Sequence, residues 1–299
     1  METLSDKELP EHYSHIKRMG LFSLSGIADK ERIEHGIATL SAIGLEAVFP
    51  HPANKTLRYL EASDSERLRM FHELLARPDV EAMMSLRGGF GVTRVLENID
   101  WELMRHRNIP IIGYSDVSAL LLAAYSKGCT RLIHGPMLCS SLAHPHPATI
   151  SAFKECLSGT TAPLLPNTTP RFIKYGSLTS RLFPANLTML CNLIGTEFMP
   201  TLDGCLLAVE DVNEAAYSID RMLAHLKNAG ILHRISGLVF GQFTDSEDAE
   251  YLPEIFTEYS EFVNGPVISD FPFGHGTPST SIQVGRLFNT DHIAGIHNH

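Results

Sequence analysis

The chain has 299 residues, of which 44% are hydrophobic and 19% are charged, the composition of a globular protein with one large or two medium domains. A formal net charge of −10 argues against a general nucleic-acid binder, because contacts with phosphate backbones require a basic face. No apolar signal core follows a basic start, and no uncharged apolar stretch reaches the length of a membrane span. We therefore expect a cytoplasmic protein that does not bind membranes.

The first half alternates between apolar stretches typical of buried strands and stretches with helical spacing. Strands are predicted over residues 20–26, 45–49, 80–86 and 109–112, and helices over residues 29–43, 63–76, 101–105 and from residue 117 onward. This alternation predicts a parallel sheet with helices on both faces. Ligands of such sheets bind at the carboxyl ends of the strands.

Residues 145–170 contain five prolines among several threonines, and we interpret this segment as a linker between domains. The pattern then starts again, with strands predicted over residues 205–210, 235–240, 266–268 and 281–286, and helices over residues 216–228 and 255–262. The sequence thus predicts an α/β protein. An N-terminal parallel-sheet domain covers residues 1–160, and a smaller C-terminal α/β domain covers residues 161–299.

Neither the cysteines nor the histidine-rich tail indicates a metal site. The five cysteines are widely spread and form no C-x-x-C pair, so we expect neither a disulfide framework nor a cysteine-bound metal. His292, His297 and His299 could together bind a metal, but an exposed, loosely ordered tail is the favoured interpretation. We expect no metal and no organic cofactor.

A short apolar run, a sharp turn and a helical stretch follow one another in residues 110–120 and place Ser115 where the strand gives way to the helix. The unpaired N–H groups at a helix start favour negative charge, which suits a serine nucleophile that forms an oxyanion. The alternative is that Ser115 or Asp116 merely caps the helix. The G-x-S-x-G pattern is absent, because Val117 replaces its second glycine.

A nucleophilic serine needs a base, and that base needs an orienting carboxylate. His275 lies between glycines in a turn rich in phenylalanine and proline, and His134 is the second candidate base. Glu210 ends an apolar strand, where a buried carboxylate is costly without a partner, although it could instead cap the next helix. Spacing alone leaves these alternatives open, because a triad is assembled in space.

A glycine-rich turn that includes Gly88 and Gly89 follows the strand predicted over residues 80–86. Glycines allow backbone N–H groups to approach a ligand closely, so this turn could form an oxyanion hole or hold a phosphate. The dinucleotide and P-loop patterns are both missing, which disfavours nucleotide phosphates as the ligand.

Several motifs occur together in a recognisable order. They are Ser-Leu-Arg-Gly-Gly-Phe-Gly at 85–91, Asn-Ile-Asp-Trp at 98–101, Gly-Tyr-Ser-Asp at 113–116, His-Gly-Pro-Met at 134–137, Leu-Ala-Val-Glu-Asp-Val-Asn-Glu at 207–214, Asp-Arg-Met-Leu at 220–223 and Phe-Gly-His at 273–275. In this order and spacing the chain resembles the LD-carboxypeptidase family, serine peptidase family S66, from about residue 20 to residue 286.

The resemblance implies a Ser-Glu-His triad in which Ser115 is the nucleophile, His275 the general base and Glu210 the group that orients the histidine. It implies an oxyanion hole made by backbone N–H groups of Asp116 and of the turn at Gly88 and Gly89. A two-domain fold and a homodimer are also implied.

The usual family reaction removes the terminal D-alanine from a murein tetrapeptide during cell-wall recycling, with no cofactor. On this resemblance, the substrate contacts are assigned to Arg87, Tyr114 and Asn186, with a structural role for Arg87 as the alternative. Two further functions stay open: an immunity-type amidase of the same family that acts on peptide-nucleotide antibiotics, and a non-catalytic protein that binds small ligands or peptides.

Two stretches depart from the family pattern. Pro184-Ala185 stands where relatives commonly have Gly-Gly, and we expect it to stiffen and narrow a loop near the substrate. The first strand ends in Ser-Leu-Ser-Gly at 23–26 where relatives have Ala-Pro-Ser, which we expect to change the rim of the site.

Overall fold

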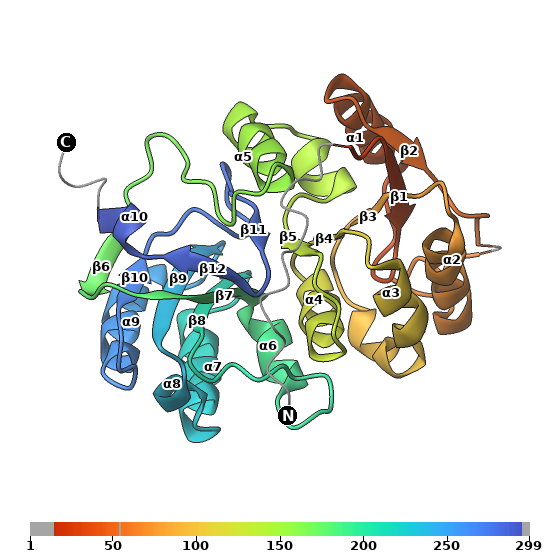
Figure 1. Ribbon diagram of the computed structural model, residues 1–299. Helices are drawn as coiled ribbons and strands as arrows, with labels where there is room; N and C mark the ends of the chain where they lie inside the picture. The colour runs from red at the N-terminus through yellow and green to blue at the C-terminus, as the bar shows by residue number, and fades with distance from the viewer. Residues whose placement is uncertain (1–14, 54, 295–299) are drawn as a thin grey trace.

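Two six-stranded sheets stand side by side in the computed structural model, which describes residues 15–53 and 55–294 (Figure 1). The first sheet has the order β11-β5-β4-β3-β1-β2, and its strands are parallel except for β11. Its strands are β1 (Arg18–Phe22), β2 (Glu46–Val48), β3 (Ala82–Ser85), β4 (Ile111–Gly113), β5 (Leu132–His134) and β11 (Ile282–Gln283).

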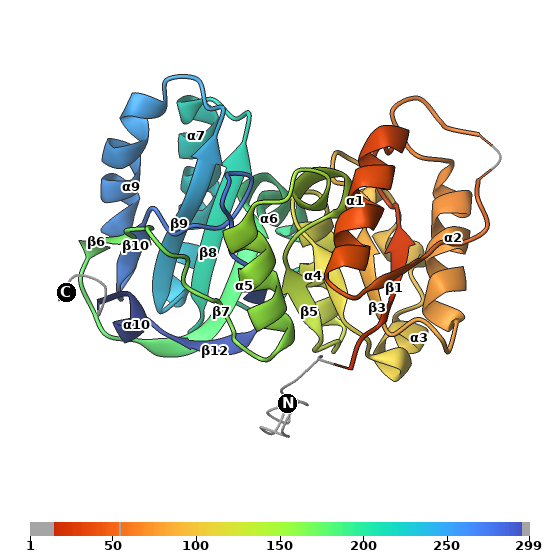
Figure 2. The same cartoon turned by 90° about the horizontal axis from the view of Figure 1, so that it is seen from above.

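Helices cover both faces of the first sheet, because successive side chains of its strands point to opposite faces and both sets are apolar. Met83 and Ile111 face one core, whereas Met84 and Ile112 face another. The first core is closed by α2 (Asp64–Ala76), α3 (Trp101–Arg107) and α4 (Val117–Ser126), and the second by α1 (Lys30–Ala42) and α5 (Pro147–Leu157), which lie toward the viewer in Figure 2.

The second sheet has the order β12-β7-β8-β9-β10-β6, with a parallel centre and an antiparallel strand at each edge. Its strands are β6 (Arg171–Lys174), β7 (Thr179–Asn186), β8 (Leu206–Val212), β9 (Gly237–Thr244), β10 (Val267–Ser269) and β12 (Arg286–Asn289). The helices of this half are α6 (Leu187–Leu193), α7 (Ala216–Asn228), α8 (Ile231–Arg234), α9 (Leu252–Ser260) and α10 (Asp291–Ala294).

One apolar cluster extends through both halves. The buried residues of α4 belong to the same cluster as those of α6 and α7, and α4 also packs against β7. The chain crosses back near its end, where β11 pairs with β5 of the first sheet. None of the helices in the described residues is both long and apolar enough to span a membrane.

The predicted α/β class is confirmed, since parallel strands alternate with helices in both halves. The linker predicted over residues 145–170 is wrong in part, because α5 occupies Pro147–Leu157. Proline is tolerated at the first helical turn, where its missing N–H has no intrahelical partner to lose. The ring of His146 completes the start of the helix by accepting a hydrogen bond from Ala148 N at 3.2 Å. The division at residue 160 stays a prediction.

Candidate active site

Ser115 lies in the turn between β4 and α4 with a φ of +61°, a left-handed conformation that is costly for a residue with a side chain. A Cβ at Gly113, two residues before it, would lie 2.7 Å from Val117 Cγ1, so the sharp corner requires glycine there. The helix N-cap position is Asp116, whose side chain makes no capping bond. The structure thus holds Ser115 in a strained turn at the start of a helix, and Asp116 is not a simple cap.

The glycine-rich turn after β3 packs directly against the side chain of Ser115. A Cβ at Gly88 would lie 2.8 Å from both Cβ and Oγ of Ser115, so only glycine fits there without a shift. Gly89 follows with a φ of +120°, which favours glycine for a second reason. The backbone that follows β3 and the start of α4 therefore converge on the side chain of Ser115.

Glu210 and His275 are in direct contact at the carboxyl end of the second sheet. Nδ1 of His275 lies 2.7 Å from Oε2 of Glu210, whose side chain is fully buried in β8. Gly274, with a φ of +119°, makes this approach possible, because a Cβ there would lie 2.7 Å from the same carboxylate oxygen. Burial raises the pKa of Glu210, and the hydrogen bond with His275 opposes that shift.

Tyr114 joins the two halves of the site. Its ring meets the ring of His275 edge to face, with centroids 4.8 Å apart, and it is the residue next to Ser115. Among the described contacts, no hydrogen bond joins Ser115 Oγ to His275. Such catalytic contacts are often long in free enzymes and tighten when the substrate binds.

His134, the second candidate base, lies in β5 and is almost fully buried. Neither of its ring nitrogens has a hydrogen-bond partner within the described part of the chain, and the rings of Tyr114 and Phe273 pack against it. Burial lowers the pKa of His134 to about 3, with the charge of His275 acting in the same direction. Its imidazole is therefore neutral and is not oriented by a carboxylate, unlike that of His275.

Asn186 and Arg87, both assigned to the substrate by resemblance, are engaged with the protein itself. The side-chain amide of Asn186 donates to Asp211 Oδ1 at 2.8 Å and to Glu210 Oε1 at 3.4 Å, behind the candidate base. Arg87 is exposed, and its guanidinium donates to the carbonyl oxygens of Gly88 and Ile27 at 3.1 and 2.9 Å. Asn186 thus holds the carboxylate of Glu210 in position, and Arg87 stabilises the turn that contains Gly88.

Pro184 and Ala185 are buried in the strand β7, so the loop expected there is wrong. The missing N–H of Pro184 disturbs no ladder with β12, because β12 pairs with β7 only as far as Leu182. On its other side, Pro184 is in register with Ala208 of β8. The pair therefore shapes the core beneath the site.

No group of three or more histidine, cysteine or acidic side chains in residues 15–53 and 55–294 is placed to hold a metal ion. His297 and His299 lie outside the described residues. The chemistry that the arrangement can support is nucleophilic: a strained serine packed against a glycine-rich turn, and a histidine in contact with a buried carboxylate.

Models of the LD-carboxypeptidase N-terminal and C-terminal domains match residues 19–135 and 179–289. The chain belongs to peptidase family S66, the LD-carboxypeptidases. This membership confirms the resemblance in the sequence motifs, and the two matched segments carry the two sheets of the fold.

Relatives in this family span nearly the whole chain. A Synechocystis sp. protein, provisionally named a carboxypeptidase, is 30% identical over 91% of this chain and 89% of its own. Murein tetrapeptide carboxypeptidase of Pseudomonas aeruginosa is 28% identical over 90% of this chain and 91% of its own. Microcin C7 self-immunity protein MccF of Escherichia coli is 26% identical over 89% and 88%.

Solved structures of the family share the fold. The muramoyltetrapeptide carboxypeptidase from Oxalobacter formigenes superposes with a TM-score of 0.80 at 25% identity, covering 91% of this chain and 94% of its own. Wild-type microcin C7 self-immunity protein MccF gives a TM-score of 0.85 at 25% identity, with 91% and 92% covered.

Proposed function

We propose that this protein is a serine LD-carboxypeptidase that removes the terminal D-alanine from murein tetrapeptides in cytoplasmic peptidoglycan recycling, and that it acts as a homodimer. The observation that carries the proposal is the contact between buried Glu210 and partly buried His275, whose ring packs against Tyr114, the residue next to the strained Ser115. A Ser-Glu-His triad is the arrangement that makes a serine hydroxyl nucleophilic without a metal.

In this mechanism Oγ of Ser115 attacks the carbonyl carbon of the bond before D-alanine. His275 takes the hydroxyl proton at Nε2, because its Nδ1 faces Glu210. The resulting oxyanion accepts hydrogen bonds from the backbone N–H groups of Asp116 and of the turn at Gly88 and Gly89. His275 then protonates the departing amine of D-alanine, and a water molecule hydrolyses the acyl-enzyme by the same steps in reverse.

The substrate's carboxylate needs a cation or N–H groups as its partner. Arg87 is the exposed cation of the glycine-rich turn, so we assign the D-alanine carboxylate to it. The ring of Tyr114 packs against His275, so we assign Tyr114 to the wall of the substrate site, and Asn186 supports the reaction by holding Glu210 in position.

The second candidate is an immunity-type amidase that acts on peptide-nucleotides. The likeness to solved structures of microcin C7 self-immunity protein MccF, at a TM-score of 0.85, favours keeping it. Both candidates use the same triad, so they differ in the substrate and not in the chemistry.

The test measures free D-alanine released from UDP-MurNAc-tetrapeptide, with EDTA present. We expect release by the wild type and by Ser126→Ala, a control at the far end of α4, and a loss of at least about 10³-fold in Ser115→Ala. If the wild type releases no D-alanine but cleaves an aminoacyl sulfamoyl nucleotide, the immunity-type candidate is correct. Turnover of neither substrate would favour the binding protein.

A further inference from the structure

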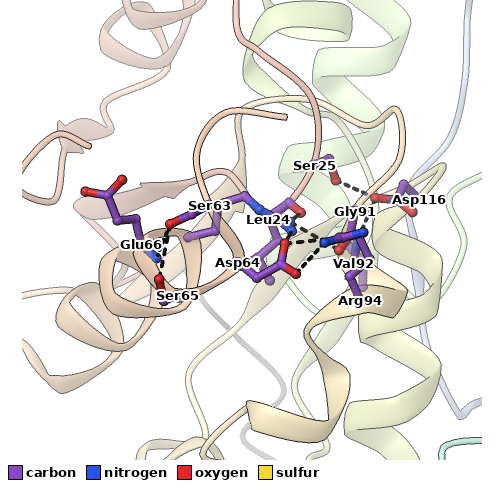
Figure 3. Close-up of polar contacts among 11 residues, drawn as sticks. Leu24, Ser25, Ser63, Asp64, Ser65, Glu66, Gly91, Val92, Arg94 and Asp116 are labelled. Carbon is purple, nitrogen blue, oxygen red and sulfur yellow. Dashed lines mark hydrogen bonds and ion pairs between the residues drawn. The ribbon is translucent and has the colours of Figure 1, made fainter. Parts of the chain in front are cut away.

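The side chain of Asp116 connects three segments around the nucleophile (Figure 3). Its Oδ2 accepts a hydrogen bond from Ser25 Oγ at 2.6 Å, in the loop after β1, and another from Val92 N at 3.0 Å, at the end of the glycine-rich turn. The carboxylate is almost fully buried, and Asp116 directly follows Ser115. One side chain at the start of α4 thus holds both loops that flank the glycines facing Ser115.

Arg67, fully buried in α2, joins the same two loops from the other side. Its guanidinium donates to the carbonyl oxygen of Leu24, next to Ser25, and to that of Gly91, next to Val92, at 3.1 Å. Asp64 holds the guanidinium in place through an ion pair at 2.6 Å. Arg67 therefore links the two loops to each other, and Asp116 hydrogen-bonds both of them to the start of α4.

This arrangement matters because the proposed oxyanion hole is divided between two segments. One donor is the N–H of Asp116, at the start of α4, and the others belong to the turn at Gly88 and Gly89. Donors of this kind stabilise a developing charge only when their spacing is fixed before the reaction. The hydrogen bond from Val92 N to Asp116 Oδ2 is a direct link between the two segments.

We propose, on the basis of the proposed serine-hydrolase function, that the Asp116 side chain is a positioning residue that keeps the two segments of the oxyanion hole in register. It acts through the hydrogen bonds from Ser25 and Val92 and does not touch the substrate. Both bonds end on one oxygen, so asparagine can accept both through its carbonyl oxygen, whereas alanine accepts neither.

Four variants test this role: Asp116→Ala, Asp116→Asn, Ser25→Ala and the control Asp100→Ala, which removes an exposed carboxylate that caps α3. We expect kcat to fall about 10²-fold or more in Asp116→Ala and about 10-fold in Ser25→Ala, with KM nearly unchanged. Asp116→Asn should bring kcat to within about 10-fold of the wild-type value, and Asp100→Ala should leave kcat at the wild-type value.

A second readout is independent of the natural substrate. A fluorophosphonate probe forms a bond between Ser115 Oγ and phosphorus, the P–F bond breaks, fluoride leaves, and His275 takes the hydroxyl proton. The phosphonyl oxygen occupies the oxyanion hole, so the rate of mass gain on the intact protein should follow the order of the kcat values. If the tetrapeptide is not the substrate, this order persists, and only the proposed function fails.

The inference is overturned by three results. Any one of them suffices. The first is that Asp116→Ala and Ser25→Ala both keep the wild-type kcat and phosphonylation rate. The second is that these variants raise KM and leave kcat unchanged, and the third is that Asp116→Asn is as slow as Asp116→Ala. Cooperative urea unfolding of each variant accompanies the kinetics. Ser25→Ala, which removes a single hydroxyl, keeps the test decisive if Asp116→Ala does not fold.

Discussion

At the scale of single residues, the candidate site carries a cost to stability at Asp116. Burial raises the pKa of its carboxyl to about 6, although the hydrogen bonds from Ser25 and Val92 and the charge of Arg67 oppose the shift. A carboxylate that is harder to ionise in the folded protein than in the unfolded chain destabilises the fold wherever it is ionised. Such costs at functional sites are offset by packing elsewhere.

Asp116→Asn should therefore change stability in a pH-dependent way. Below about pH 4 the carboxyl is protonated in both states of the wild type, so the two proteins should be nearly equally stable. As the pH rises from about 4 to above 6, the wild type should lose up to about 3 kcal/mol, at about 1.4 kcal/mol per pKa unit, while the asparagine variant loses nothing at this position.

Urea unfolding of both proteins at pH 4 and pH 8 measures this difference. Every other titrating group is common to the two proteins and cancels in the comparison. A gap in unfolding free energy that is equal at the two pH values would contradict the raised pKa of Asp116.

The sequence offered Ser115 as a candidate at a strand-to-helix turn, Glu210 at the end of an apolar strand and His275 between glycines in a turn. It left the helix caps and His134 open as alternatives. It could not reveal the contacts that position them. The hydrogen bond from Ser25 to Asp116 joins residues 91 positions apart, and the one from Asn186 to Glu210 joins two strands of the second sheet. Such pairs leave no periodic signal, so only the fold brings them together.

At the scale of elements, the sequence predicted a helix or strand correctly where all the residues that determine it lie within the segment itself. The helix α7 begins and ends as predicted, because its apolar stripe and the glycine after it lie within the segment. The strand β7 was not predicted, and its Pro184 is tolerated because the pairing of β7 with β12, a strand from the far end of the chain, stops at Leu182. Whether this segment could form a strand thus depended on a pairing partner remote in sequence.

The start of α2 offers a test of a local signal. Ser63 is the N-cap residue of this helix, with Glu66 three positions on as in a capping box, and its Oγ accepts a hydrogen bond from Glu66 N at 3.3 Å (Figure 3). Ser63→Ala should lower the unfolding free energy by about 1 kcal/mol, because that N–H loses its partner. Urea unfolding measures the loss.

Ser65→Ala is the matched control, since Ser65 Oγ contacts Ser63 Oγ within the same exposed turn. We expect it to stay within about 0.5 kcal/mol of the wild type. Equal losses in the two variants would mean that the capping bond does not stabilise α2.

At the scale of the whole molecule, the two halves are joined more closely than a linker between independent domains requires. The chain returns from the second half so that β11 pairs with β5, and the rings of Trp101 and Phe198 pack across the halves with centroids 6.2 Å apart. A site divided between Ser115 in one half and the Glu210–His275 pair in the other depends on this fixed relation. The sequence predicted a strand over residues 281–286, where β11 lies, but not its pairing with β5, because the partner strand is remote in sequence.

We therefore predict that the protein unfolds in a single transition. Trp101 is the only tryptophan, so its fluorescence reports on the contact between the halves, while far-UV circular dichroism reports on all helices. The two signals should change together during urea unfolding.

Ile282→Ala, which removes a fully buried side chain of β11, should shift both curves by the same amount, about 2–4 kcal/mol. Leu287→Ala, at an exposed position of β12, should leave both nearly in place. Separate transitions for the two signals, or a shift of only one curve, would show that the halves fold independently and that β11 does not hold the divided site together.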